Sequence, residues 1–403
     1  MADKPIDHTA TRVPGSGPLQ GVRVLDLSAY IAGPYGCSLL ADQGAEVIKI
    51  EPPGGDNLRQ YPSTLTAGSR AFLGVNRSKR GIVLNLKCER DHAALLKLVR
   101  HADVLVHNFR PGVPQRLGIE HESLSAINPR LIYCAVTGYG QNGPMQQKAG
   151  YDQVLQTMTG MCSLQGQAGG SPEIIYGSVV DYYAAALLAA GVSSALFERE
   201  RSGLGQFVDI SLLRSALTMQ SARMIQADGE PDAIDRDMRS GGVTGIHPTR
   251  DGHIYISANT PHFWHALCDK TGLADMRADT RYDTVRKRAD RVDEILPQLH
   301  RALATRSALD WEAIFGDEVP CAAARRIEEM FHHPQVQAQA ILADFEHPEV
   351  GRYRGVAESI GFGRTPGPPA FAAPVLGQDT DQVLAAIERD PDAVFRPRPG
   401  VPG

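Results

Sequence analysis

The chain has 403 residues, 42% of them hydrophobic, so it is long enough for two domains with substantial cores. Its formal net charge is −5 and its basic residues are dispersed, which argues against a nucleic-acid partner or an anionic membrane surface. The first residues contain no apolar segment of signal-peptide length, and we find no window that reaches the length of a membrane span. We therefore expect a cytoplasmic protein with no membrane partner. Six cysteines without a Cys-x-x-Cys pair predict reduced thiols and no structural metal.

The first part of the chain alternates between apolar runs and helical patterns. We expect strands at residues 22–27, 46–50, 82–86, 103–107 and 131–136, and helices at 34–44 and 91–101. Two strands joined by one helix form a right-handed β-α-β unit, in which the strands are parallel. The pattern predicts an α/β fold with a Rossmann-like, open, doubly wound sheet. Ligands of such sheets bind at the carboxyl ends of the strands.

The second part of the chain contains a long alanine-rich helix and a smaller domain. An apolar extended run from Ile174 ends at Asp181, where the helix begins, and a strand at 207–210 and a helix at 211–228 follow. Later segments alternate short strands with charged helices, which indicates a smaller α+β domain. The domains that we expect are an N-terminal arm at 1–19, a large domain at 20–224, the smaller domain at 225–330 and a return to the large domain at 331–403.

Asp181 is a candidate for two different roles. Aspartate is a preferred N-cap residue, because its carboxylate accepts hydrogen bonds from the first free N–H groups of a helix. A carboxylate at the end of a strand can equally serve as a nucleophile. Asp152 opens another expected helix, and it is open to the same interpretation as a cap. The local sequence does not decide between these roles.

Other common catalytic motifs fail in their context. Gly138, Gly140 and Gly143 match the spacing of a dinucleotide fingerprint, but Pro144 follows them instead of an apolar-periodic helix. The sequence contains no Gly-x-Ser-x-Gly nucleophile elbow. His262 and His265 lack acidic or cysteine partners nearby, so they do not indicate a metal site. We expect no permanently bound cofactor.

Eleven short motifs together resemble the family III CoA-transferases, the group that includes CaiB/BaiF proteins and formyl-CoA transferase. They begin with Gly21-Val-Arg-Val-Leu-Asp-Leu and Ala32-Gly-Pro, and they follow the family's order and spacing over residues 20 to 390. The motifs occupy residues 21–27, 32–34, 44–56, 76–82, 108–112, 138–144, 149–152, 202–209, 320–322, 333–336 and 377–381.

The resemblance implies a catalytic aspartate at the start of the alanine-rich helix, which is Asp181 here. It also implies a glycine-rich loop that closes over the site, matched by Gly241 and Gly242. The family usually has Gly before the aspartate, and this chain has Val180. The residues that match the family's CoA contacts are Ala32, Lys49, Leu84, Asn108, Phe109, Arg116 and Tyr151.

The implied reaction moves CoA from an acyl-CoA donor to a small carboxylic acid through a mixed anhydride and an aspartyl-CoA thioester. The resemblance also implies an interlocked homodimer, in which each chain passes through a ring formed by the other. Two alternatives remain, a 2-methylacyl-CoA racemase and an inactive CoA-binding homologue. In the racemases a histidine occupies the position of Tyr151, and a phenol with a pKa near 10 is a poor base at neutral pH.

Overall fold

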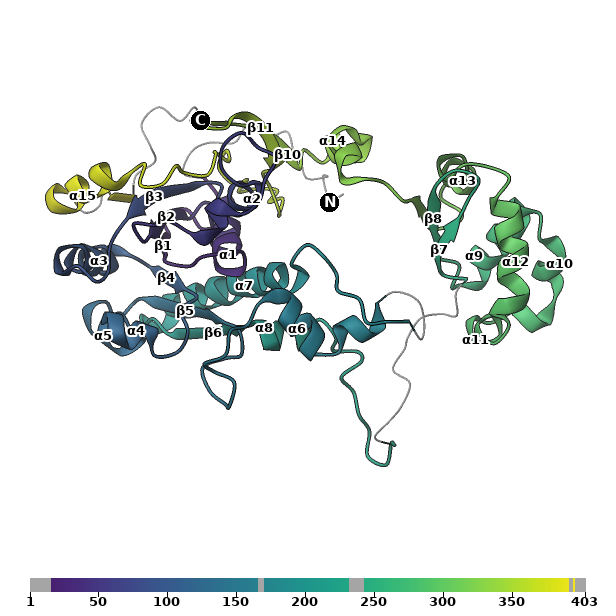
Figure 1. The fold of residues 1–403 in the computed structure, drawn as a ribbon, viewed down its shortest axis with the longest axis horizontal. Coiled ribbons are helices and arrows are strands. Elements are labelled where there is room, and N and C mark those ends of the chain that lie inside the picture. Colours follow the sequence, from purple (N-terminus) through teal and green to yellow (C-terminus); the bar gives the residue numbers. More distant parts are fainter. Residues whose placement is uncertain (1–15, 166–169, 232–242, 391–393, 396–403) are drawn as a thin grey trace. The chain divides into compact units, whose positions relative to one another are not determined.

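The computed structural model describes residues 16–165, 170–231, 243–390 and 394–395. Contacts divide the chain into two compact units. The larger unit extends to Ala227 and resumes at Pro334, and the smaller unit spans Asp228–His333 (Figure 1). The larger unit is therefore built from both ends of the chain, with the smaller one inserted between them.

The larger unit contains one sheet of six parallel strands in the order β3-β2-β1-β4-β5-β6. The strands are β1 (Arg23–Asp26), β2 (Glu46–Glu51), β3 (Lys79–Val83), β4 (Val104–His107), β5 (Ile132–Thr137) and β6 (Phe207–Ser211). The order reverses between β1 and β4, so the chain leaves these neighbours in opposite directions and a crevice forms at their carboxyl ends. The predicted parallel sheet is confirmed.

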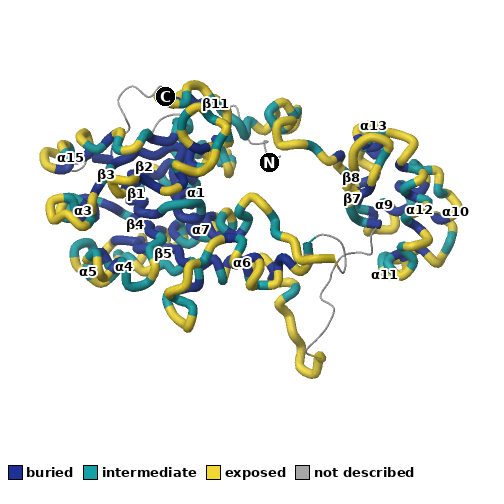
Figure 2. The backbone as a smooth tube through the Cα atoms, in the orientation of Figure 1, coloured by how far each residue is buried: buried dark blue, intermediate teal, exposed yellow. Residues whose placement is uncertain are grey.

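Helices cover both faces of this sheet, and the strands between them are buried along most of their length (Figure 2). The helices concerned are α1 (Ala32–Asp42) and α7 (Val179–Ser202) on one face, and α3 (Glu89–His101), α5 (His121–Ile127) and α15 (Thr380–Arg389) on the other. Val24 belongs to the first core and the next residue, Leu25, to the second. Both faces are apolar, which is why these strands read as continuous apolar runs.

α7, with 24 residues, is a core helix of the larger unit. It meets the length and composition criteria for a membrane span, so our expectation that no window would do so is wrong. It nevertheless packs along α1 and the sheet, and Val180, Leu188 and Val192 are fully buried there. Gly36 of α1 permits the close approach, because a Cβ at that position would lie 2.9 Å from the Leu188 side chain.

Several expected boundaries differ from the structure, and three of the differences have an identifiable form. No strand leads into α7, which begins at Val179, two residues before Asp181. The helix expected at 211–228 is the shorter α8 (Leu212–Thr218), which Ser211 caps and which ends in turns. β3 begins at Lys79 and not at residue 82, because two basic residues enter the sheet and are buried there.

Shorter elements complete the larger unit. They are η1 (Asn57–Gln60), α2 (Arg70–Val75), α4 (Val113–Leu117), α6 (Asp152–Met158), η2 (Met161–Leu164), α14 (Pro334–Ala338) and the antiparallel hairpin of β10 (Leu342–His347) and β11 (Gly351–Val356).

The smaller unit has its own core beneath an antiparallel sheet in the order β7-β8-β9. Trp264, Trp311, Phe315 and Tyr282 are buried aromatic residues of this core. Its elements are β7 (Gly245–Pro248), β8 (His253–Ile256), α9 (Pro261–Thr271), α10 (Ala274–Ala278), η3 (Thr280–Tyr282), α11 (Val285–Ala289), α12 (Val292–Leu303), α13 (Ala308–Phe315), β9 (Cys321–Ala323) and η4 (Ile327–His332).

Lys79 connects four elements at the centre of the larger unit. Its fully buried ammonium lies 2.8 Å from a carboxylate oxygen of Asp26 on β1. It also donates to the carbonyl oxygens of Pro34 (2.7 Å) and Val75 (3.3 Å) and to the side chain of Asn76 (2.9 Å). Burial alone would raise the pKa of Asp26, but Lys79 and Lys49 lower it below its ordinary value, so the carboxylate stays ionised. One buried charge thus joins β1, β3, α1 and the end of α2.

Replacing this lysine should destabilise the larger unit strongly. Lys79→Met leaves the Asp26 carboxylate buried without its partner, which costs about 3–5 kcal/mol in comparable cases. The control is Lys97→Met, because Lys97 pairs with Glu388 on the surface, and exposed pairs contribute about 1 kcal/mol or less. Denaturant unfolding should be followed by circular dichroism, since both tryptophans lie in the smaller unit. Equal stability of the two variants would contradict the role of Lys79.

Candidate active site

A cavity of ≈ 670 Å³ lies at the carboxyl edge of the six-stranded sheet. Residues that follow β1, β2, β3, β4 and β5 line it, together with the first residues of α6 and α7. All of these residues belong to the larger unit. The cavity therefore lies where the strand order reverses, which is the ligand-binding position predicted for a doubly wound sheet.

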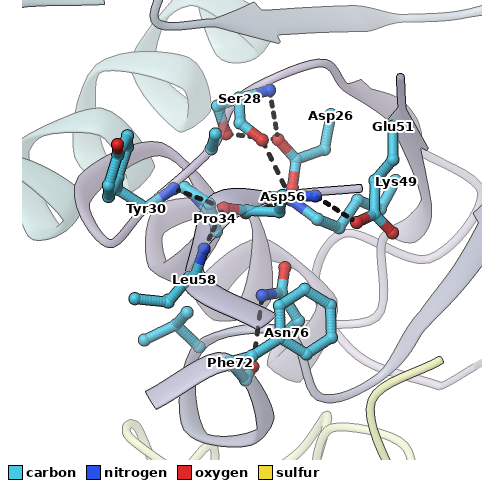
Figure 3. Close-up of polar contacts among 12 residues, drawn as sticks. Asp26, Ser28, Tyr30, Pro34, Lys49, Glu51, Asp56, Leu58, Phe72 and Asn76 are labelled. Carbon is cyan, nitrogen blue, oxygen red and sulfur yellow. Dashed lines mark hydrogen bonds and ion pairs between the residues drawn. The ribbon is translucent and has the colours of Figure 1, made fainter. Parts of the chain in front are cut away.

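Two ion pairs support the floor of the cavity, and Figure 3 shows Lys49, Asp56 and Glu51 of these pairs. The ammonium of Lys49 lies 3.1 Å from a carboxylate oxygen of Asp56, and neither side chain is more than 1% exposed. Glu51 receives two hydrogen bonds from Arg59, at 2.7 and 2.8 Å. Burial alone would lower the pKa of Lys49, but Asp26 and Asp56 raise it above its ordinary value, so Lys49 stays charged. These charges neutralise one another inside the protein.

Asp56 also fixes the loop after β1, which forms one wall of the cavity. Its carboxylate accepts the backbone N–H of Tyr30 at 3.2 Å (Figure 3). Asn108, after β4, accepts the N–H of Ala29 at 3.0 Å and donates to its carbonyl oxygen at 2.7 Å. These bonds hold Tyr30 at φ 65°, a strained conformation for a residue other than glycine. The Tyr30 ring consequently packs against the ring of Tyr151, with centroids 5.7 Å apart.

Asp181 lies in the first turn of α7 and lines the cavity. The helix begins at Val179, and its N-cap residue Ser178 makes no side-chain cap bond. Asp152 caps the helix in place of Ser178. Its buried carboxylate accepts the N–H of Val180 at 2.6 Å and that of Asp181 at 2.9 Å. The N-cap hypothesis for Asp181 is therefore wrong. The Asp181 carboxylate makes no hydrogen bond or ion pair with any residue of the described chain.

The Asp181 carboxyl is harder to ionise than an ordinary aspartate. Burial raises its pKa to about 7, and the neighbouring charge of Asp152 adds to the increase. A perturbed carboxyl group that faces a large cavity without a protein partner is typical of a functional site and atypical of a structural ion pair.

The sequence profile of CoA-transferase family III matches residues 19–380. The chain belongs to that family. It is 37% identical over 332 residues to acetyl-CoA:oxalate CoA-transferase of Acetobacter aceti, covering 81% of this chain and 85% of the relative. It is 32% identical over 388 residues to succinate–glutarate CoA-transferase of Agrobacterium fabrum, and the match covers 92% of this chain and 96% of that relative. A CAIB/BAIF family protein from Brucella suis matches the fold with a TM-score of 0.81 at 27% identity, covering 92% of this chain and all of the other.

These similarities confirm the resemblance that the motifs predicted, and they show that the chain is a family III CoA-transferase. The names of these two relatives contain oxalate, succinate and glutarate as the acids of those proteins.

The structure brings most of the predicted CoA contacts to one cavity. Its walls include Ala32, Leu84, Asn108, Phe109 and Tyr151. The two basic residues of the prediction do not line it. Lys49 is buried beneath the floor in its ion pair, and Arg116 is exposed on α4. Gly241 and Gly242 lie outside the described residues. The roles of all these residues stay predictions.

Three other basic residues line the cavity: Lys87, Arg110 and Lys148. None of them is among the CoA contacts predicted from the sequence. Lys87 directly follows the strand expected at 82–86, a position that already indicated the ligand-binding edge of the sheet. Lys148 lies in a loop with no periodic pattern, so nothing in the sequence indicated its direction.

Asp181→Asn should raise the melting temperature at pH 8. The folded pKa of about 7 lies above the unfolded value, so the stability that the neutral carboxyl contributes is complete below pH 4 and lost as the pH rises through 7. Asparagine removes this loss, so the variant should melt about 2 °C or more above the wild type at pH 8. The difference should shrink at pH 5.

Differential scanning fluorimetry at both pH values measures the effect. Glu173→Gln, which removes an exposed carboxylate, is the matched control and should change neither melting temperature. A variant less stable than the wild type at pH 8 would show that ionised Asp181 is not an unfavourable charge.

Proposed function

We propose that this enzyme transfers CoA from an acyl-CoA donor to a carboxylic acid acceptor, with Asp181 as the covalent nucleophile. The observation that carries the proposal is the Asp181 carboxylate, which lines the ≈ 670 Å³ cavity and has no partner in the described chain. The family resemblance assigns the nucleophile to the same residue. Lys87 and Lys148 supply positive charge for the phosphate groups of CoA.

The first half of the reaction loads CoA onto the enzyme. A carboxylate oxygen of Asp181 attacks the thioester carbonyl of the donor, the carbon–sulfur bond breaks, and CoA leaves as a thiolate. A mixed anhydride between Asp181 and the donor acyl group results. The thiolate then attacks the Asp181 carbonyl carbon of this anhydride. The donor acid leaves as a carboxylate, and Asp181 becomes an aspartyl-CoA thioester.

The second half repeats these steps with the acceptor. The acceptor carboxylate attacks the aspartyl thioester carbonyl and expels CoA thiolate, which forms a second mixed anhydride. The thiolate attacks the acceptor acyl carbon, gives the product acyl-CoA and regenerates the Asp181 carboxylate. Atoms and charge balance without a redox partner. Each tetrahedral intermediate carries an oxyanion that needs N–H donors, and Gly241 and Gly242 are our candidates for that role.

Asp181→Asn tests the nucleophile directly. Since Asp181 is not the cap of α7, the variant should fold, while its turnover should fall by roughly 10³-fold or more because an amide cannot replace the attacking carboxylate. Exchange of CoA between acids, followed by chromatography of the CoA esters, measures the loss. Glu173→Gln serves again as the control and should retain full activity. An active Asp181→Asn variant would remove the assignment.

We infer that the acid substrates are small dicarboxylates. The relatives named after oxalate and after succinate and glutarate support this class. A second carboxylate needs a basic partner, and Arg59, Arg77 and Arg110 are three arginines of the larger unit to compare for this role. Arg59 is paired with Glu51, and Arg77 is paired with Asp42. Arg110 instead lines the cavity, where its charge acts electrostatically on Tyr151, the residue before Asp152. Arg110 is therefore the candidate for binding the distal carboxylate.

Arg110→Gln should separate acid binding from CoA binding. If Arg110 pairs with the distal carboxylate, the variant should raise KM for a dicarboxylic acid by about tenfold or more, the scale of a lost hydrogen bond to a charged group. KM for a monocarboxylic acid and for the acyl-CoA donor should change little. Steady-state kinetics with succinate and butyrate provide the comparison. An equal rise in KM for the acyl-CoA would place Arg110 at a CoA phosphate instead.

Two features favour the transferase over its alternatives. Tyr151 occupies the position of the racemase histidine, and hydrogen bonding to Tyr30 raises its pKa above that of an ordinary phenol, so it is a poor base at neutral pH. Rapid α-deuteration of a chiral 2-methylacyl-CoA without acid exchange would reverse this preference.

The cation-lined cavity and Asp181 favour an active enzyme over an inactive homologue, and absence of CoA exchange over a broad panel of acids would contradict this.

We propose the interlocked homodimer on the ground that the larger unit contains both chain ends with the smaller unit inserted between them. Tyr176 and Phe197 of the larger unit are 84% and 68% exposed, which is apolar surface that a second chain would cover. A concentration-dependent monomer in sedimentation would contradict the interlocked homodimer.

The cytoplasmic location stays a prediction from the sequence.

A further inference from the structure

A second cavity, of ≈ 360 Å³, lies beside the loop that follows β4. Phe109 and Pro111 of this loop line both cavities. The remaining walls come from the last residue of β4, α4, the start of α5, β5, the loop after β5 and the first residue of β6. Among the described lining residues none is lysine or arginine, in contrast to the three cations of the first cavity.

Flat rings form much of the wall of this second cavity. The ring of His107 stacks on that of Phe109, with centroids 5.4 Å apart, and meets the ring of Tyr133 edge-on at 5.0 Å. Tyr133 in turn stacks on Phe207 at 5.5 Å, and His121 meets both of these rings at 5.6 Å. Aromatic walls of this kind favour a planar ligand.

Three buried polar atoms at this cavity have no partner within the described chain. They are Nε2 of His107, Oε2 of Glu120 and Nε2 of Gln141. His107 is only 2% exposed, and burial lowers its pKa to about 3, so its ring is neutral. Because Nδ1 accepts the N–H of Phe109 at 3.1 Å, the proton of the neutral ring lies on Nε2. The cavity therefore offers two hydrogen-bond donors and one acceptor.

Leaving buried polar atoms unpaired is unfavourable, and three of them around one cavity indicate that something completes them. The acceptor of Glu120 requires a donor on the ligand, and the donors of His107 and Gln141 require acceptors. Without lysine or arginine on its wall, this cavity is poorly matched to a phosphate. A planar, uncharged nitrogen heterocycle that carries an exocyclic amine satisfies all of these conditions.

We propose that the second cavity is a binding site for a neutral amino-substituted heterocycle of the adenosine type, separate from the CoA cavity. The exocyclic amine donates to Glu120, ring nitrogens accept from His107 and Gln141, and the ring packs on the aromatic wall. The site does not depend on the proposed transferase mechanism, because Asp181 takes no part in it.

Isothermal titration with adenosine tests the site on the full-length protein, with saturating CoA present to fill the first cavity. We expect saturable binding that persists with CoA, and a dissociation constant at least about tenfold higher for Glu120→Gln, because the bond to a charged acceptor is weakened. Glu173→Gln is the control, since Glu173 is exposed and does not line this cavity, and it should change the constant less than about twofold.

Purine riboside, which lacks the exocyclic amine, keeps the test valid if Glu120→Gln fails to fold. It should bind the wild type at least about tenfold more weakly than adenosine. Three results would overturn the proposal: no saturable binding, loss of adenosine binding when CoA is present, or equal affinity in wild type and folded Glu120→Gln. The second result would mean that adenosine occupies the CoA cavity.

Discussion

The geometry of the active site depends on the hydrogen bonds that Asp152 accepts from the first turn of α7. A helix that starts at a cavity needs a cap for its free N–H groups, and the nearest carboxylate on the helix itself is Asp181. Because Asp152 accepts the N–H groups of Val180 and Asp181, the Asp181 side chain is left without a partner among the described residues. The same arrangement keeps two carboxylates close together, and their repulsion adds to the effect of burial on the pKa of Asp181.

The buried ion pairs beneath the cavity complement this arrangement. Lys79 with Asp26 and Lys49 with Asp56 neutralise charges that would otherwise be costly at the centre of the sheet. They also anchor the loops after β1 and β2, including the strained backbone at Tyr30. The cations that remain available to a ligand are on the walls, where Lys87, Arg110 and Lys148 are located. The charged residues of this region thus divide into those that form buried ion pairs and those that line the cavity.

The sequence predicted the features that depend on local patterns. β1, β2, β4 and β5 were predicted from their continuous apolar runs. Such runs indicate strands of a parallel sheet because both faces of that sheet are buried. Features that depend on distant partners were missed. Lys79 lies in a strand because Asp26, 53 positions away, compensates its charge. Arg288 stands among basic residues in the sequence, yet it is buried and donates to the carbonyl oxygens of Tyr282, Ala258 and Asn259.

The candidate site was predictable mainly through the family resemblance, which named Asp181 and the five predicted CoA contacts that line the cavity. The most direct test of the account is mass spectrometry of wild-type enzyme given a donor acyl-CoA without acceptor. The account predicts one CoA added per chain and a hydroxylamine-labile thioester on the peptide that contains Asp181. Absence of the adduct, or its location on the peptide that contains Asp152, would contradict the assignment of Asp181 as the nucleophile.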